Sequence, residues 1–366
     1  MNMQFCLGKS FNQSLKIVHP AYDTGIYKRW NPYNHPIMRT GQYIYQAVFK
    51  SLLLAAAMSF VTFSASAGEL HMMPVNIFGD GDPDNGVEDD RHQLLGGRRR
   101  GVSLADQRMN AGTIKCDGKI RGTAMVIDTR EFAPGLKGAV LASAAHVLYD
   151  LDKRKRFKRC DFHFLALNEL HRYQAKIDLR QVKMGEYDPG QTTESLEFGE
   201  GDWVFMYVPK PWKGFDPDEA LVASVFSFAN MESFQQSGGE FRLIAFDADA
   251  RVISVSNHCR VIESKQDDLG GGAWKGQLLD DCDSTSGSSG GGIVAVSQGK
   301  QYLIGIRNGS HWSQQTYPVD EFPTGPPDGA SWDQSANTNF ARAFDSKLLS
   351  ELKNFSMSLV RDNTLY

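Results

Sequence analysis

Ser289 lies in a setting that suits a nucleophilic serine. It belongs to the stretch Asp281–Val296, DCDSTSGSSGGGIVAV, which contains Gly-Ser-Ser-Gly-Gly from Gly287 to Gly291. Glycines on both sides of a serine let the backbone turn tightly, expose the hydroxyl and aim two backbone N–H groups at one point. The apolar run that follows predicts a buried strand that would hold this turn rigid. Taken alone, the same stretch is equally typical of a flexible Gly/Ser linker.

A nucleophilic serine needs a base, and His146 is the candidate. It ends the run Ala139–His146, AVLASAAH, which is apolar and rich in small residues. Small residues before the histidine would let it lie at the end of a tightly packed strand, with its ring free to reach a partner. A single histidine after an apolar run is otherwise a structural residue.

Asp202 could be the carboxylate that fixes the tautomer of the histidine. It follows Gly201 and precedes the strongly apolar run Trp203–Val208. An acid in such a place is otherwise a turn residue. The three residues occur in the order His, Asp, Ser, with separations of 56 and 87 residues, and this combination favours nucleophilic catalysis over three unrelated local explanations.

Three motifs carry a resemblance to the trypsin/chymotrypsin-like serine peptidases. ASAAH resembles the TAAH motif of that family, GDWVFMYV resembles its Asp-[Ile/Val]-Ala-hydrophobic strand, and GSSGG resembles its GDSGG. The order His, Asp, Ser is also the order of that family. The similarity covers about Ile114–Leu352. DCDSTSGSSGG looks closest to the bacterial glutamyl-endopeptidase branch, which also carries a non-acidic residue before the serine.

The resemblance implies a secreted serine endopeptidase that acts on a protein or peptide without a cofactor. Ser289 would be the nucleophile, His146 the general base and Asp202 the group that orients the histidine. The backbone N–H groups of Gly287 and Ser289 would form the oxyanion hole. Two alternatives stay open: a catalytically inactive, protease-like binding protein, and an esterase that uses the same triad.

Four residues are expected to line the substrate pocket. Asp283 stands six residues before Ser289, where trypsin-like enzymes place the acid that attracts Lys or Arg, although the glutamyl-endopeptidase branch often has an Asp there too. The segment with Arg307, Asn308 and Gly309 resembles the strand that lines the pocket, and Arg307 falls near the histidine that recognises acidic side chains in that branch. A buried Asp283–Arg307 pair would neutralise both charges, so the preference of the pocket for basic or acidic substrate side chains stays open.

Two positions depart from the family pattern. Ser288 stands where trypsin-like enzymes carry an aspartate that pairs with a newly freed amino terminus, so that activation switch is expected to be absent. Gly292 replaces the usual proline, a change that a loop should tolerate.

The elements that would position these residues are short strands separated by turns. Many β-branched and aromatic runs without long helices between them predict an all-β barrel or sandwich. The resemblance narrows this to two six-stranded β-barrels in a peptidase domain of residues 111–360: barrel 1 at about 111–213 with His146 and Asp202, and barrel 2 at about 238–340 with Ser289. Apolar residues at helical spacing predict a C-terminal helix at about 344–359. The clearest predicted strands are Gly122–Asp128, Ala139–Ala145, Asp161–Leu167, Trp203–Val208, Glu240–Phe246, Arg251–Ser256, Gly291–Val296 and Tyr302–Arg307.

The first 110 residues read as targeting and processing segments. The 13-residue apolar run Ser51–Phe63, with basic residues before it and Ala-Ser-Ala after it, predicts a signal peptide at 38–67 that is cleaved after Ala67. The run is too short to span a bilayer, so no stable membrane anchor is expected, and export would end in the periplasm or outside the cell. Residues 1–37 are either a start assigned too early or an extension. Residues 68–110 are either a pro-segment or an N-terminal arm, and GRRRG at 97–101 is either a processing site or an exposed basic loop.

Composition gives no reason to expect a nucleic-acid partner. The chain has 366 residues, of which 41% are hydrophobic and 22% charged, which suits a globular protein. Removal of residues 1–67 takes away six Lys/Arg and one Asp, so the formal charge moves from −4 to −9. The one basic run, Lys153–Arg159, fits a solvated loop. The mature chain is expected to be a monomer.

Four cysteines remain after Ala67, and an even number in an exported chain predicts two disulfides. Three pairings exist, of which Cys116–Cys160 and Cys259–Cys282 are favoured because they bracket the histidine strand and tie down the serine loop. No metal site is expected. The cysteines lack the C-x-x-C spacing of zinc sites, and the acidic loop at 80–86 has Arg91 where a calcium loop needs a glutamate.

Overall fold

The computed structural model describes residues 78, 91–93, 110–165, 172–190, 197–211, 215, 217–225, 231–248, 251–263, 276–313, 315–318, 320–321, 326–327 and 329–364. All of them belong to one compact unit, Ala67–Tyr366. The predicted signal peptide, the extension at 1–37, the acidic loop at 80–86 and the GRRRG segment lie outside the described residues.

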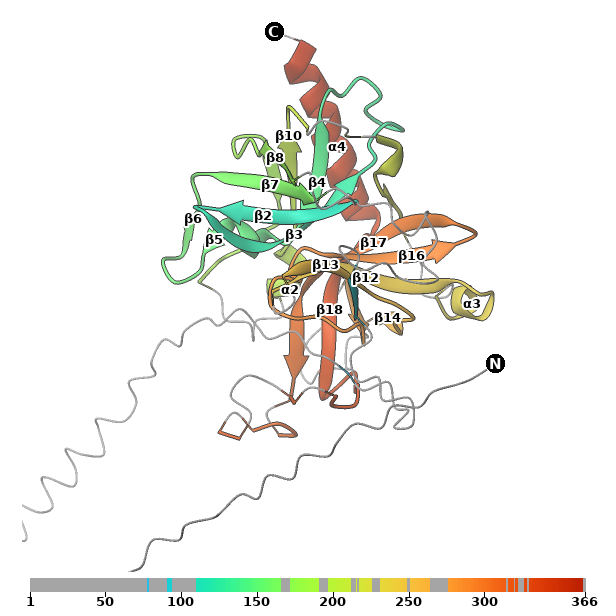
Figure 1. The fold of residues 1–366 in the computed structure, drawn as a ribbon. Coiled ribbons are helices and arrows are strands. Elements are labelled where there is room, and N and C mark those ends of the chain that lie inside the picture. The colour runs from blue at the N-terminus through green and yellow to red at the C-terminus, as the bar shows by residue number, and fades with distance from the viewer. Residues whose placement is uncertain are drawn as a thin grey trace, which may run out of the picture. The chain divides into compact units, whose positions relative to one another are not determined.

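Seven antiparallel strands form the first sheet, in the order β8-β7-β2-β3-β4-β10-β9. The neighbouring strands β4 and β10 of this curled sheet are buried throughout (Figure 1). The strands are β2 (Ala111–Cys116), β3 (Lys119–Ile127), β4 (Ala139–Ser143), β7 (Cys160–Leu165), β8 (Arg172–Lys176), β9 (Val182–Met184) and β10 (Val204–Val208).

A second sheet follows the path β1-β13-β12-β16-β17-β18-β15-β14, with the short strand β11 pairing in parallel with β17. The predicted nucleophile loop lies between β15 and β16, and β16 forms an antiparallel hairpin with β17. The strands are β1 (Arg91–Gln93), β11 (Val222–Ala223), β12 (Glu240–Asp247), β13 (Val252–Ser256), β14 (Val261–Glu263), β15 (Gln277–Asp280), β16 (Gly292–Ser297), β17 (Lys300–Trp312) and β18 (Asn337–Ala343).

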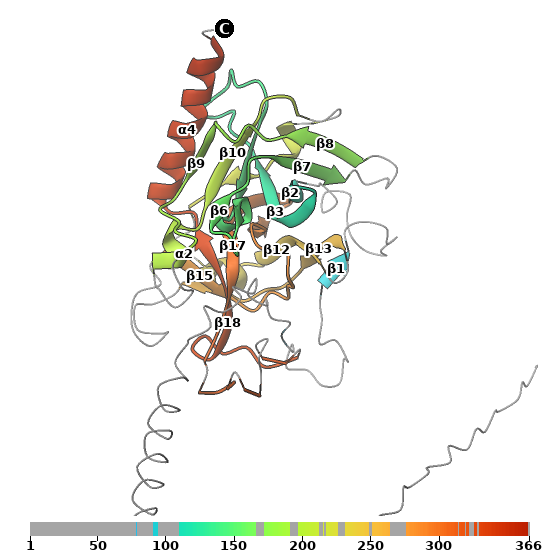
Figure 2. The same ribbon diagram turned by 90° about the vertical axis from the view of Figure 1, so that its left-hand side faces the viewer.

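Among the described residues, the helices are few and one of them is long. Helix α4 (Ser346–Thr364) begins after Asp345, whose carboxylate accepts a hydrogen bond from the Leu348 N–H at 2.7 Å and so caps the first turn. Its apolar face packs on the first sheet, where the ring of Phe205 lies 6.5 Å from that of Phe355 in the helix (Figure 2). The shorter elements are η1 (Ala145–Leu148), α2 (Glu197–Gly201), η2 (Pro217–Glu219), α3 (Met231–Gln236) and the small hairpin of β5 (Tyr149–Asp150) and β6 (Lys155–Arg156).

The predicted fold class, two antiparallel β-barrel sheets followed by a C-terminal helix, is confirmed. Each of the eight predicted strands falls on an observed strand, and the short edge strands bring the two sheets to seven and nine strands. The helix begins two residues later and ends five residues later than predicted, because its polar last turn lacks the apolar spacing on which the prediction relied.

The structure contains two disulfides, and their pairing is the one that the sequence favours. Cys116–Cys160 joins β2 to β7, and Cys259–Cys282 joins the segment after β13 to the segment that leads into the serine loop. The described residues contain no helix that is long and apolar enough to cross a membrane.

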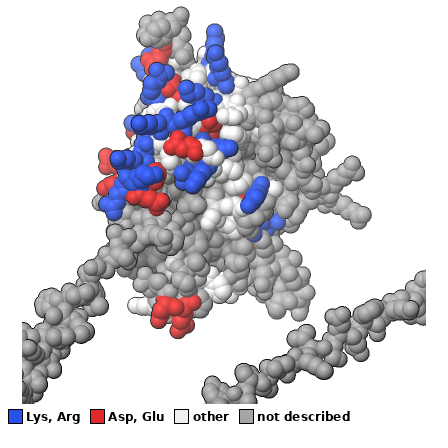
Figure 3. Space-filling model, turned by 60° about the vertical axis from the view of Figure 1, so that its left-hand side comes forward, with Lys and Arg blue, Asp and Glu red and all other residues white. Residues whose placement is uncertain are grey.

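The basic run Lys153–Arg159 is mostly exposed, and carboxylates lie among its neighbours. Lys153 pairs with Asp150 at 2.7 Å, and the Arg159 guanidinium lies 3.4 Å from Asp161. Figure 3 shows Lys and Arg gathered on one face of the molecule with Asp and Glu between them. This mixture fits the solvated loop that the sequence predicts.

Candidate active site

His146 lies three residues after the end of strand β4. The strand ends at Ser143, and the chain then enters the one-turn helix η1, in which His146 is the second residue. Alanines at 144 and 145 are fully buried, so the chain can turn there without a large side chain to place. The imidazole is 10% exposed and therefore has a mostly protein environment.

Asp202 lies between helix α2 and strand β10 and is completely buried. Its two carboxylate oxygens both contact His146: Oδ2 lies 2.7 Å from the ring Nδ1, and Oδ1 accepts a hydrogen bond from the backbone N–H at 2.9 Å. Because a carboxylate only accepts hydrogen bonds, Nδ1 carries the proton and Nε2 is the basic nitrogen of the neutral ring. This arrangement fixes both the tautomer and the orientation of the imidazole.

Ser289 lies in a tight turn whose glycines have positive φ angles, 97° at Gly287 and 82° at Gly290. The turn packs against the first sheet. The Ser289 carbonyl accepts a hydrogen bond from the Thr123 N–H at 2.8 Å. A side chain at Gly290 would collide with Ser143, the last residue of the strand that precedes His146. These contacts bring the serine loop beside the end of the histidine strand, although 143 residues of sequence separate the two candidates.

Two N–H groups of this turn differ from their neighbours. The N–H groups of Ser288, Gly290 and Gly291 donate backbone hydrogen bonds within the fold, to Thr285, Arg307 and Ser288 carbonyls respectively. Across the described part of the chain, the N–H groups of Gly287 and Ser289 have no such acceptor. Two donors on alternate residues of one tight turn are the arrangement that an oxyanion hole requires.

Thr123 in β3 is a site residue that the sequence does not reveal. Its hydroxyl donates to the Gly287 carbonyl at 2.9 Å and accepts from the Phe246 N–H at 2.8 Å, while its own N–H bonds Ser289. One buried threonine therefore links the first sheet, the end of β12 and the serine loop. Nothing in the local sequence indicates that Thr123 has a different role from any other β-branched residue in a strand.

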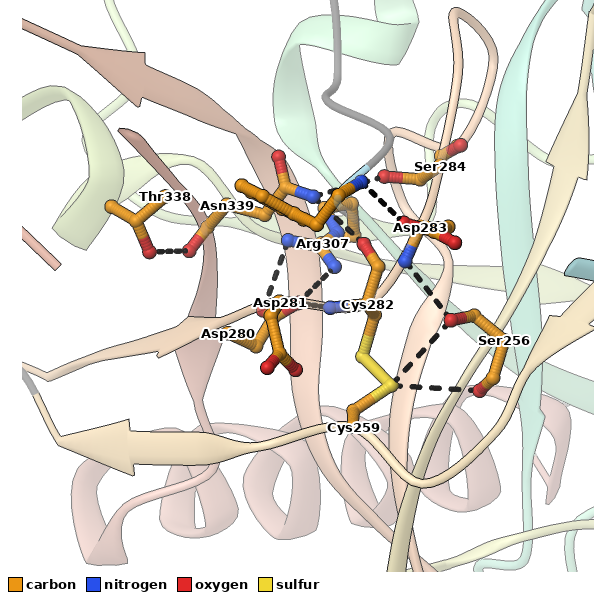
Figure 4. Close-up of polar contacts among 12 residues, drawn as sticks. Ser256, Cys259, Asp280, Asp281, Cys282, Asp283, Ser284, Arg307, Thr338 and Asn339 are labelled. Carbon is orange, nitrogen blue, oxygen red and sulfur yellow. Dashed lines mark hydrogen bonds and ion pairs between the residues drawn. A yellow bond between two sulfur atoms is a disulfide. The ribbon is translucent and has the colours of Figure 1, made fainter. Parts of the chain in front are cut away.

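The pocket residue Arg307 is fully buried and forms two hydrogen bonds with Asp280, Nη1 to Oδ2 at 2.9 Å and Nη2 to Oδ1 at 2.5 Å (Figure 4). Arg307 therefore pairs with Asp280 and not with Asp283, the possibility considered above. Asp280 ends strand β15, and strands β15 and β17 both pair with β18, which lies between them. An arginine on one strand can thus reach the second strand along, and the sequence offered three nearby acids without showing which one it would meet.

Asp283 is buried and has a different set of partners. Its Oδ1 accepts a hydrogen bond from the backbone N–H of Phe78 at 2.6 Å, and its own N–H donates to Ser256 Oγ at 2.9 Å. Phe78 is itself buried and forms a β-bridge with Ala330. A residue of the N-terminal segment therefore contacts the acid that the family resemblance assigns to the pocket.

Asn308 and Gly309 lie at a bulge in β17, where the pairing with β18 shifts. The Asn308 side chain donates to the Gly199 carbonyl at 3.0 Å, three residues before Asp202. It therefore ties the second sheet to the helix that precedes the candidate acid. No group of three or more His, Cys, Asp or Glu side chains among the described residues could hold a metal ion.

No protein-family model matches the chain, and no curated protein matches it. Solved structures do match. A thermostable serine protease AL20 from an extremophilic microorganism has 12% identity and a TM-score of 0.43, over 69% of this chain and 99% of that one. A Glu endopeptidase in complex with MPD has 11% identity and a TM-score of 0.44, and the match covers 77% of this chain and 99% of that one. The protease Anisep from Arthrobacter nicotinovorans has 8% identity and a TM-score of 0.41, and the match covers 68% of this chain and 95% of that one. Similarities this distant carry no argument about activity, which has to rest on the geometry of the site.

Proposed function

We propose that this chain is an exported serine endopeptidase that hydrolyses peptide bonds through an acyl-enzyme. The observation that carries the proposal is the buried pair of His146 and Asp202, joined by two hydrogen bonds, beside the turn that presents Ser289. A carboxylate that holds Nδ1–H leaves Nε2 ready to take a proton from a serine hydroxyl.

The reaction follows from these roles. Ser289 Oγ attacks the carbonyl carbon of the substrate, and its proton passes to His146 Nε2. The carbonyl oxygen becomes an oxyanion that the N–H groups of Gly287 and Ser289 stabilise. The C–N bond then breaks as His146 returns the proton to the leaving amine. A water molecule attacks the acyl-enzyme, again giving its proton to His146, and the carboxylic acid product and free Ser289 result.

Asp202 supports both proton transfers without accepting the proton itself. When Nε2 is protonated, the ring carries a positive charge, and a fully buried carboxylate 2.7 Å from Nδ1 stabilises that charge. The backbone hydrogen bond from His146 to the same carboxylate keeps the ring at its place through both steps.

Acidic side chains should be poor occupants of the pocket. The charge of Arg307 is neutralised by Asp280, so Arg307 offers no net positive charge to a substrate carboxylate. Asp283 adds a negative charge to the same region, where it receives one backbone N–H. The arrangement favours basic or neutral side chains over acidic ones, which a peptide library tests directly.

Export is part of the proposal because two disulfides suit an oxidising compartment. The mature protein would begin after Ala67, act in the periplasm or outside the cell, and work as a monomer on protein or peptide substrates.

Active-site labelling tests the proposed function. Protein of residues 68–366 is treated with a fluorophosphonate, and the adduct is located by peptide mapping. We expect the adduct on Ser289, its loss in His146→Ala, and its retention in the matched control Ser286→Ala. An adduct with ester but no peptide turnover would identify an esterase. A folded, disulfide-bonded chain with no adduct, before or after cleavage near Arg100, would identify an inactive binding protein.

A further inference from the structure

Arg91 belongs to the N-terminal segment, yet it is built into the second sheet. It starts β1, which pairs antiparallel with β13, with Arg91 opposite Ser256. Figure 2 shows this short strand at the edge of the sheet, beside β13. Its side chain is only 8% exposed. A long cationic side chain is buried to this extent only when it has a partner.

One such partner is Asp247, the last residue of β12. Arg91 Nη1 lies 3.4 Å from Asp247 Oδ1 and donates to Thr285 Oγ1 at 3.3 Å. The Asp247 side chain is 1% exposed. Ser254 Oγ donates to its other oxygen, so this contact and those below engage both oxygens of a buried carboxylate.

Asp247 in turn holds the beginning of the serine loop. Its Oδ1 accepts hydrogen bonds from the Thr285 N–H at 3.1 Å, from Thr285 Oγ1 at 3.3 Å and from Ser288 Oγ at 3.2 Å. Ser288 Oγ also donates to the Thr285 carbonyl at 2.6 Å, and the Ser288 N–H bonds the same carbonyl at 3.1 Å. The turn from Thr285 to Ser288 is thus closed on itself and fixed to one carboxylate.

This turn contains Gly287 and leads directly into Ser289, the two residues whose N–H groups are the proposed oxyanion donors. A shift of the turn would move both donors relative to the developing oxyanion, and catalysis is sensitive to such small displacements. The donors that reach Asp247 from Thr285, Ser288 and Ser254 are neutral, whereas Arg91 brings a positive charge to it. Removal of that charge would take away a positive charge that stabilises a buried carboxylate.

We propose that Arg91 is a positioning residue, which acts through Asp247 to hold the Gly287 and Ser289 N–H groups in their catalytic orientation. The inference rests on the proposed peptidase function. Ser288 stands where the related enzymes carry an acid for a freed amino terminus, and here an internal arginine from the preceding segment braces the same turn instead. The Arg91–Asp247 contact is present before any cleavage and does not require a new amino terminus.

It follows that the part of the N-terminal segment that carries Arg91 stays with the enzyme after the signal peptide is removed. A cut in GRRRG at 97–101 would separate Arg91 covalently from the peptidase domain. The β1–β13 pairing and the Arg91–Asp247 contact would then have to hold the cut segment in place for activity to continue.

The test compares Arg91→Ala with wild type and with Arg130→Ala, a matched control whose guanidinium pairs with Asp128 and Asp218 at an exposed site. For Arg91→Ala we expect kcat on an ester or peptide substrate to fall about 10- to 100-fold with KM nearly unchanged, because oxyanion donors act in the transition state. The rate of labelling of Ser289 by the fluorophosphonate should fall in parallel, and added methylguanidinium should restore part of it. Arg130→Ala should behave as wild type.

A folded Arg91→Ala protein with wild-type kcat would overturn the inference, as would a fall in kcat that methylguanidinium does not reverse. If Arg91→Ala does not fold, the charge-matched double variant Arg91→Gln/Asp247→Asn replaces it, since it leaves no buried charge alone. That variant should fold and show the same loss of kcat, and full kcat would overturn the inference. A wild-type chain without a Ser289 adduct would instead refute the proposed function, so the two failures are distinguishable.

Discussion

The two halves of the candidate site are held in different ways. The acid–base half, His146 and Asp202, is built within the first sheet, where two hydrogen bonds join residues at the ends of neighbouring strands. The nucleophile half, the Ser289 turn, depends on groups from elsewhere: Thr123 from the first sheet, Asp247 from β12, and Arg91 from the N-terminal segment. Substitutions around the acid–base half should therefore have small effects on activity. Substitutions of distant residues that contact the Ser289 turn should lower it.

The largest effect should come from breaking the acid–base half itself. Asp202→Asn keeps the size of the side chain, but it can stabilise the wrong imidazole tautomer and no longer balances the charge on the protonated ring. We expect kcat to fall about 10⁴-fold, as such a change does in a serine peptidase triad. Ester turnover measures the loss, with Asp178→Asn as a control, since Asp178 pairs with Arg180 at an exposed site. A loss below about tenfold would contradict the role given to Asp202.

Removing the disulfides one at a time tests whether each half of the site depends on its disulfide for stability and for activity. From the separations of 44 and 23 residues, loss of Cys116–Cys160 should lower the free energy of unfolding by about 4 kcal/mol and loss of Cys259–Cys282 by about 3 kcal/mol. Denaturant unfolding of the paired Cys→Ala variants measures both. Among the protein that stays folded, only the second variant should label more slowly at Ser289. Equal labelling rates would mean that the nucleophile half does not depend on this anchor.

Thr123→Val tests the link between the sheets. The variant keeps the β-branched shape but loses the hydrogen bond to the Gly287 carbonyl and leaves the Phe246 N–H without its acceptor. We expect a loss of about 1–3 kcal/mol in the free energy of unfolding and a fall in kcat of about tenfold, since a donor is displaced rather than deleted. Thr123→Ser, which keeps the hydroxyl, should restore most of both. If the serine variant were as slow as the valine variant, the hydroxyl would not be the link.

The smallest effect concerns Asp281, at the start of the serine stretch. Burial raises the pKa of this carboxyl to about 6. Because the folded-state pKa lies above the unfolded value, the neutral form stabilises the folded protein below about pH 4, and this contribution is lost as the pH rises through 6. Asp281→Asn should therefore be more stable than wild type by about 1–2 kcal/mol at pH 7.5, and equally stable at pH 3.5. Thermal unfolding at both pH values measures the difference, and an equal gain at both would rule out titration of Asp281 as its cause.

The sequence predicts the local features of this site well. His146, Asp202 and Ser289 each stand beside an apolar run or a glycine cluster, and those runs become strands β4, β10 and β16. Alternation and turn residues depend on near neighbours, so they leave a readable pattern. The two disulfides could also be predicted from the sequence, because four cysteines allow only three pairings.

Contacts between distant residues leave no such pattern. Thr123 and Gly287 lie 164 residues apart, and Arg91 and Thr285 lie 194 apart. The sequence could not show the partner of Arg307, because Asp280, Asp281 and Asp283 are all close together in sequence, and only the placement of β15 two strands from β17 decides among them. Such residues are recognised only when the sheet is known.

The packing of α4 has a consequence for the order in which this protein can be assembled. The helix follows the second sheet in the chain, yet its apolar side chains complete the core of the first sheet. During synthesis the strands that carry His146 and Asp202 emerge early, but their cover is made only after more than 300 residues have been translated. The first sheet thus remains an open, incompletely covered surface until Leu352 and its neighbours arrive. Under the export proposed above, a chain that cannot close early would stay extended enough to pass through an export channel, and His146 and Asp202 would meet only after that passage.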